Sequence, residues 1–257
     1  MNKVVKNIAH RGASALAPEN TLPAFELALQ LGVNEVELDV RRCATGEVIV
    51  IHDKSVDRTT DGIGAVKDKS FAEIKALDAG SWFDERFRGE SVPALDEVFD
   101  LLAGRLTVNI ELKGGSLNPD GIEQVVVESI RRHGMIERVI ISSFNPCRLR
   151  RIRAKAPELK TALIFSPYNS LYLRRAWFAP ILKVDGLHAF HSMVDRHFVD
   201  GAHRRGRWVY AWTVDEREQM EKLILTGLDG IVTNDPRLLK GVLESTHMNS
   251  AASGRER

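Results

Sequence analysis

The stretch VVKNIAHRGASALAPENT, residues 4–21, begins with a short apolar run that changes abruptly into polar residues. The run at residues 4–9 has the composition of a first β-strand. His10 and Arg11 follow it directly, ahead of a glycine, and residues 17–21 have the composition of a helix start. A histidine and an arginine at the end of a strand are placed for chemistry rather than for packing.

The same unit, a strand followed by a helix, repeats along most of the chain. Helical segments with apolar residues three and four apart separate the apolar runs. Asn145-Pro146 and Asp235-Pro236 each combine a capping residue with a proline at the first helical position. Eight such units in 257 residues predict parallel strands closed into a (β/α)8 TIM barrel, with a doubly wound open sheet as the alternative. The strands are expected at residues 4–9, 35–40, 106–112, 139–142, 161–165, 184–187, 208–213 and 230–233.

An additional strand, at residues 48–52, does not fit this alternation. Too few residues separate it from the second strand for a parallel crossover, which needs about a dozen. We therefore expect it to return antiparallel through a turn at residues 44–46, with Leu38 or Asp39 opposite His52. It begins a small insertion after strand two, at about residues 43–93, which we expect over the barrel mouth because long structured loops are usually functional.

Composition narrows the class of protein. Apolar residues make up 44% and charged residues 28%, as in ordinary globular proteins, and the formal net charge of +1 gives no reason to expect a nucleic-acid partner. No apolar run approaches the roughly 18 residues of a membrane span, so stable membrane insertion is not expected. Cys43 and Cys147 suit neither a disulfide framework nor a zinc site. With no signal-peptide pattern, they favour the cytoplasm.

One domain is expected over residues 1–244, followed by a disordered polar tail at 245–257. The tail residues are small and polar, as is common at chain ends. The sequence carries no signal for an oligomeric state.

Two adjacent strands carry the same inverted pattern of polar and apolar residues. In the second, Glu37 and Asp39 alternate with apolar residues, and Glu111 and Lys113 do so in the next. Because one face of a barrel strand meets the helices and must be apolar, the polar rows should point inward. The three carboxylates are hard oxygen ligands that suit Mg²⁺ or Ca²⁺ better than zinc. Alternatively, they pair with lysine or arginine, or face solvent.

The histidines at the strand ends have three possible roles. His10 and His52 can be metal ligands, ordinary surface residues, or a general acid and base that titrate near neutrality. Arg11 offers a bidentate fork for an anionic oxygen, and Lys113 offers a point charge. A cation, an arginine and a lysine together describe a phosphate site in which charge developing at phosphorus is stabilised.

Eight short motifs between about residue 8 and residue 240, in this order and spacing, resemble those of the glycerophosphodiester phosphodiesterases. They are His10-Arg11-Gly12, Pro18-Glu19-Asn20-Thr21, Glu37-Leu38-Asp39-Val40, His52-Asp53, Arg58-Thr59-Thr60-Asp61-Gly62, Asn109-Ile110-Glu111-Leu112-Lys113, Ala211-Trp212-Thr213-Val214 and Thr233-Asn234-Asp235-Pro236.

The resemblance implies a TIM barrel with a small insertion after strand two. It also implies metal-dependent hydrolysis of small glycerophosphodiesters, such as glycerophosphocholine or glycerophosphoethanolamine, to sn-glycerol 3-phosphate and an alcohol. The roles it implies are a divalent cation, Mg²⁺ or Ca²⁺, on Glu37, Asp39 and Glu111, acid–base catalysis by His10 and His52, and phosphate contacts by Arg11 and Lys113.

Two other functions stay open at this stage. A lysophospholipase D acting on single-chain lipids would need an apolar track, which Trp82, Phe83, Phe87 and Trp212 can provide. A non-catalytic barrel that binds a phosphate ligand would have no need of two titrating histidines.

Several further residues have both a functional and a structural interpretation. Trp212 ends its strand and can line the pocket against glycerol carbons or serve as a core aromatic residue. Glu19 and Asn20 can hold the first loop, or Asn20 can cap the following helix. His188 can touch the substrate. Cys147 lies near a helix start but has no histidine beside it, so we interpret it as an ordinary cysteine.

Overall fold

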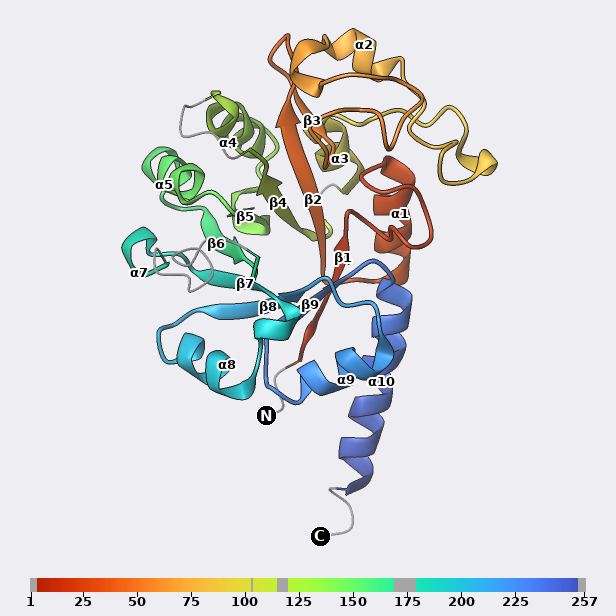
Figure 1. Ribbon diagram of the computed structural model, residues 1–257. Coiled ribbons are helices and arrows are strands. Elements are labelled where there is room, and N and C mark those ends of the chain that lie inside the picture. Colours follow the sequence, from red (N-terminus) through yellow and green to blue (C-terminus); the bar gives the residue numbers. More distant parts are fainter. Residues whose placement is uncertain (1–3, 103, 115–119, 169–178, 254–257) are drawn as a thin grey trace.

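The computed structural model describes residues 4–102, 104–114, 120–168 and 179–253. Within them, eight parallel strands pair side by side into a closed ring, because β1 pairs with both β2 and β9 (Figure 1). The expected (β/α)8 barrel is thus confirmed, and the open-sheet alternative is wrong. The barrel strands are β1 Lys6–His10, β2 Glu35–Arg42, β4 Thr107–Leu112, β5 Val139–Ser143, β6 Lys160–Phe165, β7 Gly186–Phe190, β8 Trp208–Trp212 and β9 Gly230–Thr233.

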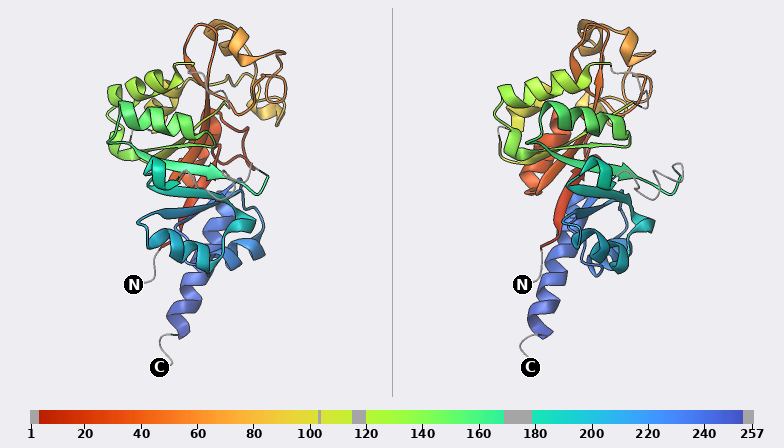
Figure 2. Two further views of the ribbon diagram at one scale, coloured as in Figure 1. Left: turned by 60° about the vertical axis from the view of Figure 1, so that its left-hand side comes forward. Right: turned by 90° about the vertical axis from the view of Figure 1, so that its left-hand side faces the viewer.

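Helices surround the barrel and bury their apolar stripes against the outer faces of the strands (Figures 1 and 2). In α3, the buried residues Leu95, Val98, Phe99 and Leu102 have the helical spacing of three and four. The α-helices are α1 Leu22–Leu31, α2 Phe71–Lys75, α3 Leu95–Leu102, α4 Ile122–Arg132, α5 Pro146–Lys155, α7 Ala179–Leu182, α8 Arg196–His203, α9 Arg217–Ile224 and α10 Pro236–Ser253; short 3-10 helices are η1 Val66–Asp68, η2 Glu85–Phe87, η3 Ile136–Arg138 and η4 His191–Met193.

The additional strand, β3 (Val48–Val50), pairs antiparallel with β2 as expected. Val40 lies opposite Val50, and this register continued by two residues places Leu38 opposite His52. The backbone N–H of Ile51 still donates to the carbonyl of Asp39, at 2.9 Å. The hairpin therefore places His52 opposite Leu38 of β2, next to the inward row of carboxylates on that strand.

The insertion has a small apolar core of its own, formed by buried residues that include Ile49, Ile51 and Ile74. Val48 and Val50 face the main core instead. Successive side chains of β3 point to opposite faces, so this strand contributes to both cores. Figure 1 shows the insertion on one side of the barrel, near α1 and α3. Among the described residues of the insertion, His52 is the only one on the wall of the central cavity. The insertion thus flanks the central cavity and contributes His52 to its wall.

The largest differences from the expected boundaries are at β7 and α10. The sixth barrel strand, β7, was expected at residues 184–187 but runs over Gly186–Phe190, because the chain turns first at Lys183, which has a positive φ of 51°. His188 consequently lies inside the strand. The last helix, α10, extends to Ser253 and so into the segment expected as a polar tail. That segment contains neither glycine nor proline before Gly254, so nothing in it breaks a helix.

Candidate active site

Three carboxylates meet inside the barrel at the carboxyl ends of two adjacent strands. Asp39 of β2 lies beside Glu111 of β4, and Glu37 is two residues earlier on β2. Each offers an oxygen within 4.8 Å of the others, and all three are buried. The apolar residues between them on the same strands, such as Leu38, face the helices. The predicted inward rows are therefore present, and these three carboxylates can hold a cation.

The positive charges of Lys113 and Arg11 are too few to keep all three carboxylates ionised. Burial, together with repulsion from Asp39 and Glu111, raises the pKa of Glu37 well above its usual range. Burial likewise raises the pKa of Glu111. Burial also opposes ionisation of Asp39, but Lys113 and Arg11 outweigh it and hold the pKa of Asp39 below its usual range. Buried, hard oxygen donors whose charge Lys113 and Arg11 balance only in part fit a divalent cation.

Two basic side chains border the carboxylates. Lys113 Nζ lies 2.8 Å from Asp39 Oδ1 and 2.7 Å from Glu111 Oε1, and Arg11 Nε lies 3.2 Å from Asp39 Oδ2. Arg11 has a left-handed backbone, with φ of 56°, which turns its N–H toward Glu37 Oε2 at 3.2 Å. Such backbone strain is common at functional sites. The following Gly12 is required, since a Cβ there would lie 2.6 Å from the Ala24 backbone.

The His10 ring is held with one nitrogen free. Asn234 donates its amide hydrogen to Asp215 Oδ2 at 2.7 Å, so its Oδ1 must face His10 Nδ1, also at 2.7 Å. Nδ1 of His10 therefore carries the hydrogen, and Nε2 keeps its lone pair. Nε2 lies 3.9 Å from Glu37 Oε2. Burial, followed by the charge of Arg11, lowers the pKa of His10 to about 4.

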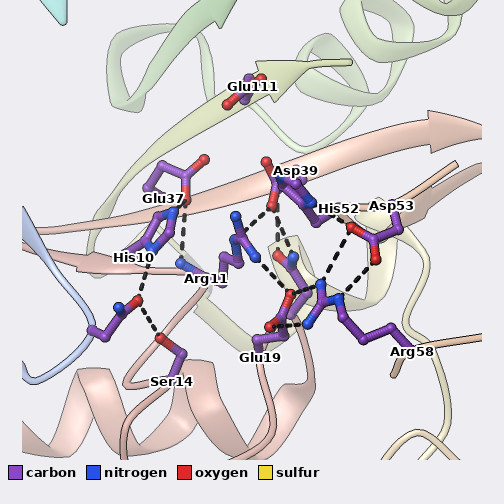
Figure 3. Close-up of polar contacts among 12 residues, drawn as sticks. His10, Arg11, Ser14, Glu19, Glu37, Asp39, His52, Asp53, Arg58 and Glu111 are labelled. Carbon is purple, nitrogen blue, oxygen red and sulfur yellow. Dashed lines mark hydrogen bonds and ion pairs between the residues drawn. The ribbon is translucent and has the colours of Figure 1, made fainter. Parts of the chain in front are cut away.

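The His52 ring is held in the same sense by a carboxylate. Its Nδ1 lies 2.6 Å from Asp53 Oδ1, and its pKa is lowered by burial. Asp53 in turn accepts from Arg58 Nε at 2.7 Å. Arg58 also donates from both Nη atoms to Glu19, at 2.8 Å each, and Glu19 accepts from Arg11 Nη1 at 2.8 Å. Figure 3 shows this continuous chain from His52 to Arg11.

The cavity over the carboxylates has a volume of about 180 Å³. His10, Arg11, Glu37, His52, Glu111 and Lys113 line its polar side, and Phe144, Ile164, Trp212 and Val232 line its apolar side. Trp212 is fixed there, because its Nε1 donates to the His188 carbonyl at 2.9 Å and its ring meets Phe144 edge-on at 5.4 Å. Of the eight site residues predicted from the sequence, seven line this cavity. The eighth, Asp39, is buried beside Glu111 and is not among the lining residues.

The remaining candidate residues have either a contact at the site or none. Asn20 does not cap α1, whose N-cap is Thr21. Instead, its side chain donates to Asp39 Oδ2 at 3.0 Å and orients that carboxylate. His188 lines the cavity wall and stacks on Tyr210, and burial lowers the pKa of its ring to about 3. Cys147 lines neither this cavity nor the one beside it.

Sequence reasoning missed two groups of residues. Asn234 and Asp215 orient His10, and Arg58 links the two sides of the site. Asn234 and Arg58 stood within the motifs quoted for the family resemblance, but no role was assigned to them. Asp215 lies three residues after the end of β8 and carried no signal, because its partner Asn234 directly follows the next strand.

At the carboxyl ends of its strands, the barrel holds buried carboxylates, two imidazoles with free nitrogens and two cationic side chains. This combination defines a class of phosphoric diester hydrolases. No helix among the described residues is both long and apolar enough to cross a membrane.

Comparisons with known proteins agree with this class. The model of the glycerophosphoryl diester phosphodiesterase family matches residues 10–238. A glycerophosphodiester phosphodiesterase of Caldanaerobacter subterraneus is 44% identical over 234 residues, which are 90% of this chain and 95% of the relative. A solved phosphodiesterase of Oleispira antarctica, in complex with the product sn-glycerol-3-phosphate, is 32% identical with a TM-score of 0.83, covering 92% of this chain and 96% of that one.

A solved glycerophosphodiester phosphodiesterase of Agrobacterium tumefaciens is also 32% identical, with a TM-score of 0.79, and covers 91% of this chain and 98% of that one. The chain belongs to the glycerophosphoryl diester phosphodiesterase family, as its motifs predicted, and it is an enzyme of that activity.

Proposed function

We propose that the protein hydrolyses small glycerophosphodiesters, such as glycerophosphocholine or glycerophosphoethanolamine, to sn-glycerol 3-phosphate and an alcohol in a metal-dependent reaction. The observation that carries this proposal is the placement of His10 and His52, each held through Nδ1, on the wall of the cavity that also holds the carboxylates. The related Oleispira antarctica enzyme, solved with sn-glycerol-3-phosphate, supports the product.

Glu37, Asp39 and Glu111 would hold the cation, Mg²⁺ or Ca²⁺. When bound, it would balance the charge of the carboxylates and the phosphate and lower the pKa of a coordinated water or hydroxyl. The raised pKa of Glu37 supports this assignment, because burial and the charges of Asp39 and Glu111 outweigh the charges of Lys113 and Arg11 at that carboxyl.

Arg11 and Lys113 would orient the phosphate. Lys113 uses two contacts in the structure, one to Asp39 and one to Glu111, so a third ammonium hydrogen is available. Arg11 donates from Nη1 to Glu19, and its Nε faces Asp39. Trp212 would pack against the glycerol carbons on the apolar side of the cavity. Together these contacts stabilise the charge that develops on the phosphoryl oxygens.

His10 and His52 would act as the acid–base pair. The low pKa of His10 keeps Nε2 unprotonated at neutral pH, which suits the removal of a proton from the attacking oxygen. His52, backed by Asp53, would then protonate the departing alcohol. The attacking oxygen belongs either to water or to the glycerol hydroxyl of the substrate itself, through a cyclic phosphate.

The test is release of glycerol 3-phosphate from a panel of glycerophosphodiesters, with EDTA and metal add-back. Release that stops with EDTA and returns with Mg²⁺ or Ca²⁺ is expected. Undiminished release after EDTA treatment would contradict the metal dependence.

The lysophospholipase D alternative finds no support in the insertion. Trp82, Phe83 and Phe87 contact each other edge to face, at 5.8 and 5.9 Å, and none of them lines either cavity at the site. Among the described residues, Trp82, Phe83 and Phe87 therefore do not extend the cavity wall that Trp212 forms.

We also propose that the protein acts in the cytoplasm, since Cys43 and Cys147 are both free thiols. Cell fractionation with an antibody against the protein tests this location.

A further inference from the structure

A second cavity, of about 460 Å³, adjoins the first at the ends of β2, β4 and β5. The two cavities share four lining residues, His52, Glu111, Lys113 and Phe144. Beyond these shared residues, the second cavity is lined by Arg41, Leu112, Gly114, Ser143, Asn145 and Pro146. None of the assigned roles uses Arg41.

Arg41 continues the inward row of β2, two residues after Asp39. Its Nε and Nη2 donate to the backbone carbonyl of His52, at 2.9 and 2.7 Å, which fixes the guanidinium beside the catalytic hairpin. The side chain is half-buried. No carboxylate of the described residues lies within 4.0 Å of it, although every other cation at the site has one.

The positions of the two cavities suggest which part of the substrate each would hold. The smaller one has the apolar wall of Trp212, Ile164 and Val232, which suits glycerol carbons. A phosphate between Arg11 and Lys113 then directs its other ester oxygen toward His52, on the boundary of the two cavities. The departing alcohol would therefore lie in the second cavity, against Arg41.

We propose that this cavity is the subsite for the departing alcohol and that Arg41 selects alcohols bearing an anionic group over cationic ones such as choline and ethanolamine. The inference rests on the proposed function and ranks substrates within it. A fixed, unpaired guanidinium attracts a carboxylate and repels an ammonium. One unit of headgroup charge about 6 Å away, in a medium between protein and water, changes kcat/KM by roughly tenfold.

The experiment uses three glycerophosphodiesters that differ mainly in headgroup charge: glycerophosphoethanolamine, its N-acetyl derivative and N-acetylated glycerophosphoserine. At pH 7 these headgroups are cationic, neutral and anionic. We expect kcat/KM of the unmodified enzyme, with Mg²⁺ or Ca²⁺ present, to rise in that order by about tenfold per step. A preference for the cationic headgroup would overturn the proposal, and this ranking needs no variant.

The variant Arg41→Gln keeps donors for the His52 carbonyl and removes the charge. We expect it to flatten the ranking to within about threefold, while Arg41→Lys keeps the order. Arg42→Gln is the matched control, because Arg42 is exposed on the opposite face of β2 and lines neither cavity. An equal loss for all three substrates in Arg41→Gln would show that Arg41 only positions His52, and would overturn the selection role.

Failure of the proposed function gives a different result. If none of the three diesters releases glycerol 3-phosphate with either metal, the hydrolysis itself is wrong and the subsite falls with it. If all three are hydrolysed at equal rates, the function stands and only the subsite proposal is overturned.

Discussion

The proposed catalytic roles of His10 and His52 depend on which ring nitrogen carries the hydrogen. In both rings Nδ1 is engaged by an acceptor, the amide oxygen of Asn234 for His10 and the Asp53 carboxylate for His52. Nε2 is therefore the nitrogen available to the substrate in each case. Burial and the charge of Arg11 lower the pKa of His10 against the hydrogen bond to Asn234. Burial also lowers the pKa of His52, and the hydrogen bond to Asp53 opposes that shift.

Replacement of either histidine by alanine should abolish most turnover while binding is kept. We expect kcat of His10→Ala and of His52→Ala to fall by about 100-fold or more, because each removes a proton-transfer group. Glycerol 3-phosphate release measures kcat, and calorimetric titration with glycerol 3-phosphate measures binding. Near-normal turnover in either variant would rule out the acid–base assignment.

His188 makes stability depend on pH. Its pKa in the folded protein is about 3, against 6.5 for an ordinary histidine, so between these values the unfolded chain binds a proton that the native ring does not. The free energy of unfolding therefore falls as pH drops below about 6.5, by about 2 kcal/mol at pH 5. In His188→Phe, which keeps a ring against Tyr210, this contribution should be missing.

Urea unfolding at pH 7.5 and pH 5 provides the measurement for His188. The comparison uses the pH-induced loss in each protein, so any change in packing that acts equally at both pH values cancels. Losses that are equal in the unmodified protein and His188→Phe would refute the assignment.

At the scale of elements, the β2–β3 hairpin was predictable because a short connection allows only an antiparallel return. The inward rows of β2 and β4 were predictable from the period of two. The position of β7 was not, since it depends on the left-handed turn at Lys183, for which lysine gives no signal. The flank position of the insertion was also unpredictable, because its own core around Ile74 decides where it packs.

Arg58 joins two of these elements, the insertion and the loop before α1. It holds Asp53 behind His52 and Glu19 beside Arg11. In Arg58→Gln we expect kcat and KM both to worsen, with kcat/KM lower by about 10-fold to 100-fold, because small misplacements of reacting groups are costly. Steady-state kinetics with one glycerophosphodiester substrate measures the split between the two constants.

The control for this variant is Arg88→Gln, which removes an exposed arginine paired with Glu85 elsewhere in the insertion. It should leave both constants unchanged. Arg58→Lys should recover part of the loss, because an ammonium can reach one carboxylate but cannot bridge both. An Arg58→Gln enzyme with unaltered kcat and KM would mean that the chain of contacts serves stability alone.

At the scale of the whole molecule, the eightfold alternation and the ordered motifs were sufficient to predict the barrel and to name the carboxylates and histidines. The network around them was not predictable, because Asp215 and Arg58 reach the site only through the closure of the ring and the packing of the insertion. The second cavity was not predictable either. Arg41 lines it and Arg42 does not, and the two arginines differ only in the face of β2 that they occupy.

Because Glu37, Asp39 and Glu111 are buried together, we expect the stability of the whole barrel to depend on a cation. A metal that binds only the folded chain adds about 2.7 kcal/mol at a concentration 100 times its Kd. For a domain of this size, we expect Tm to rise by roughly 5 to 10 °C when Mg²⁺ or Ca²⁺ is added after EDTA treatment. The rise should shrink as pH falls, because burial raises the pKa of Glu37 and Glu111 and protons then compete with the metal.

Thermal unfolding followed by circular dichroism gives Tm without any dependence on activity. Glu111→Gln should lose most of the metal-induced rise, because it removes one of the three proposed charged ligands. Glu26→Gln changes the same side chain on the exposed surface of α1 and should keep the full rise. If the metal raises Tm equally in all three proteins, the cation binds elsewhere. If it raises Tm in none of them, the carboxylates at this site do not hold a metal and owe their burial to Lys113 and Arg11 alone.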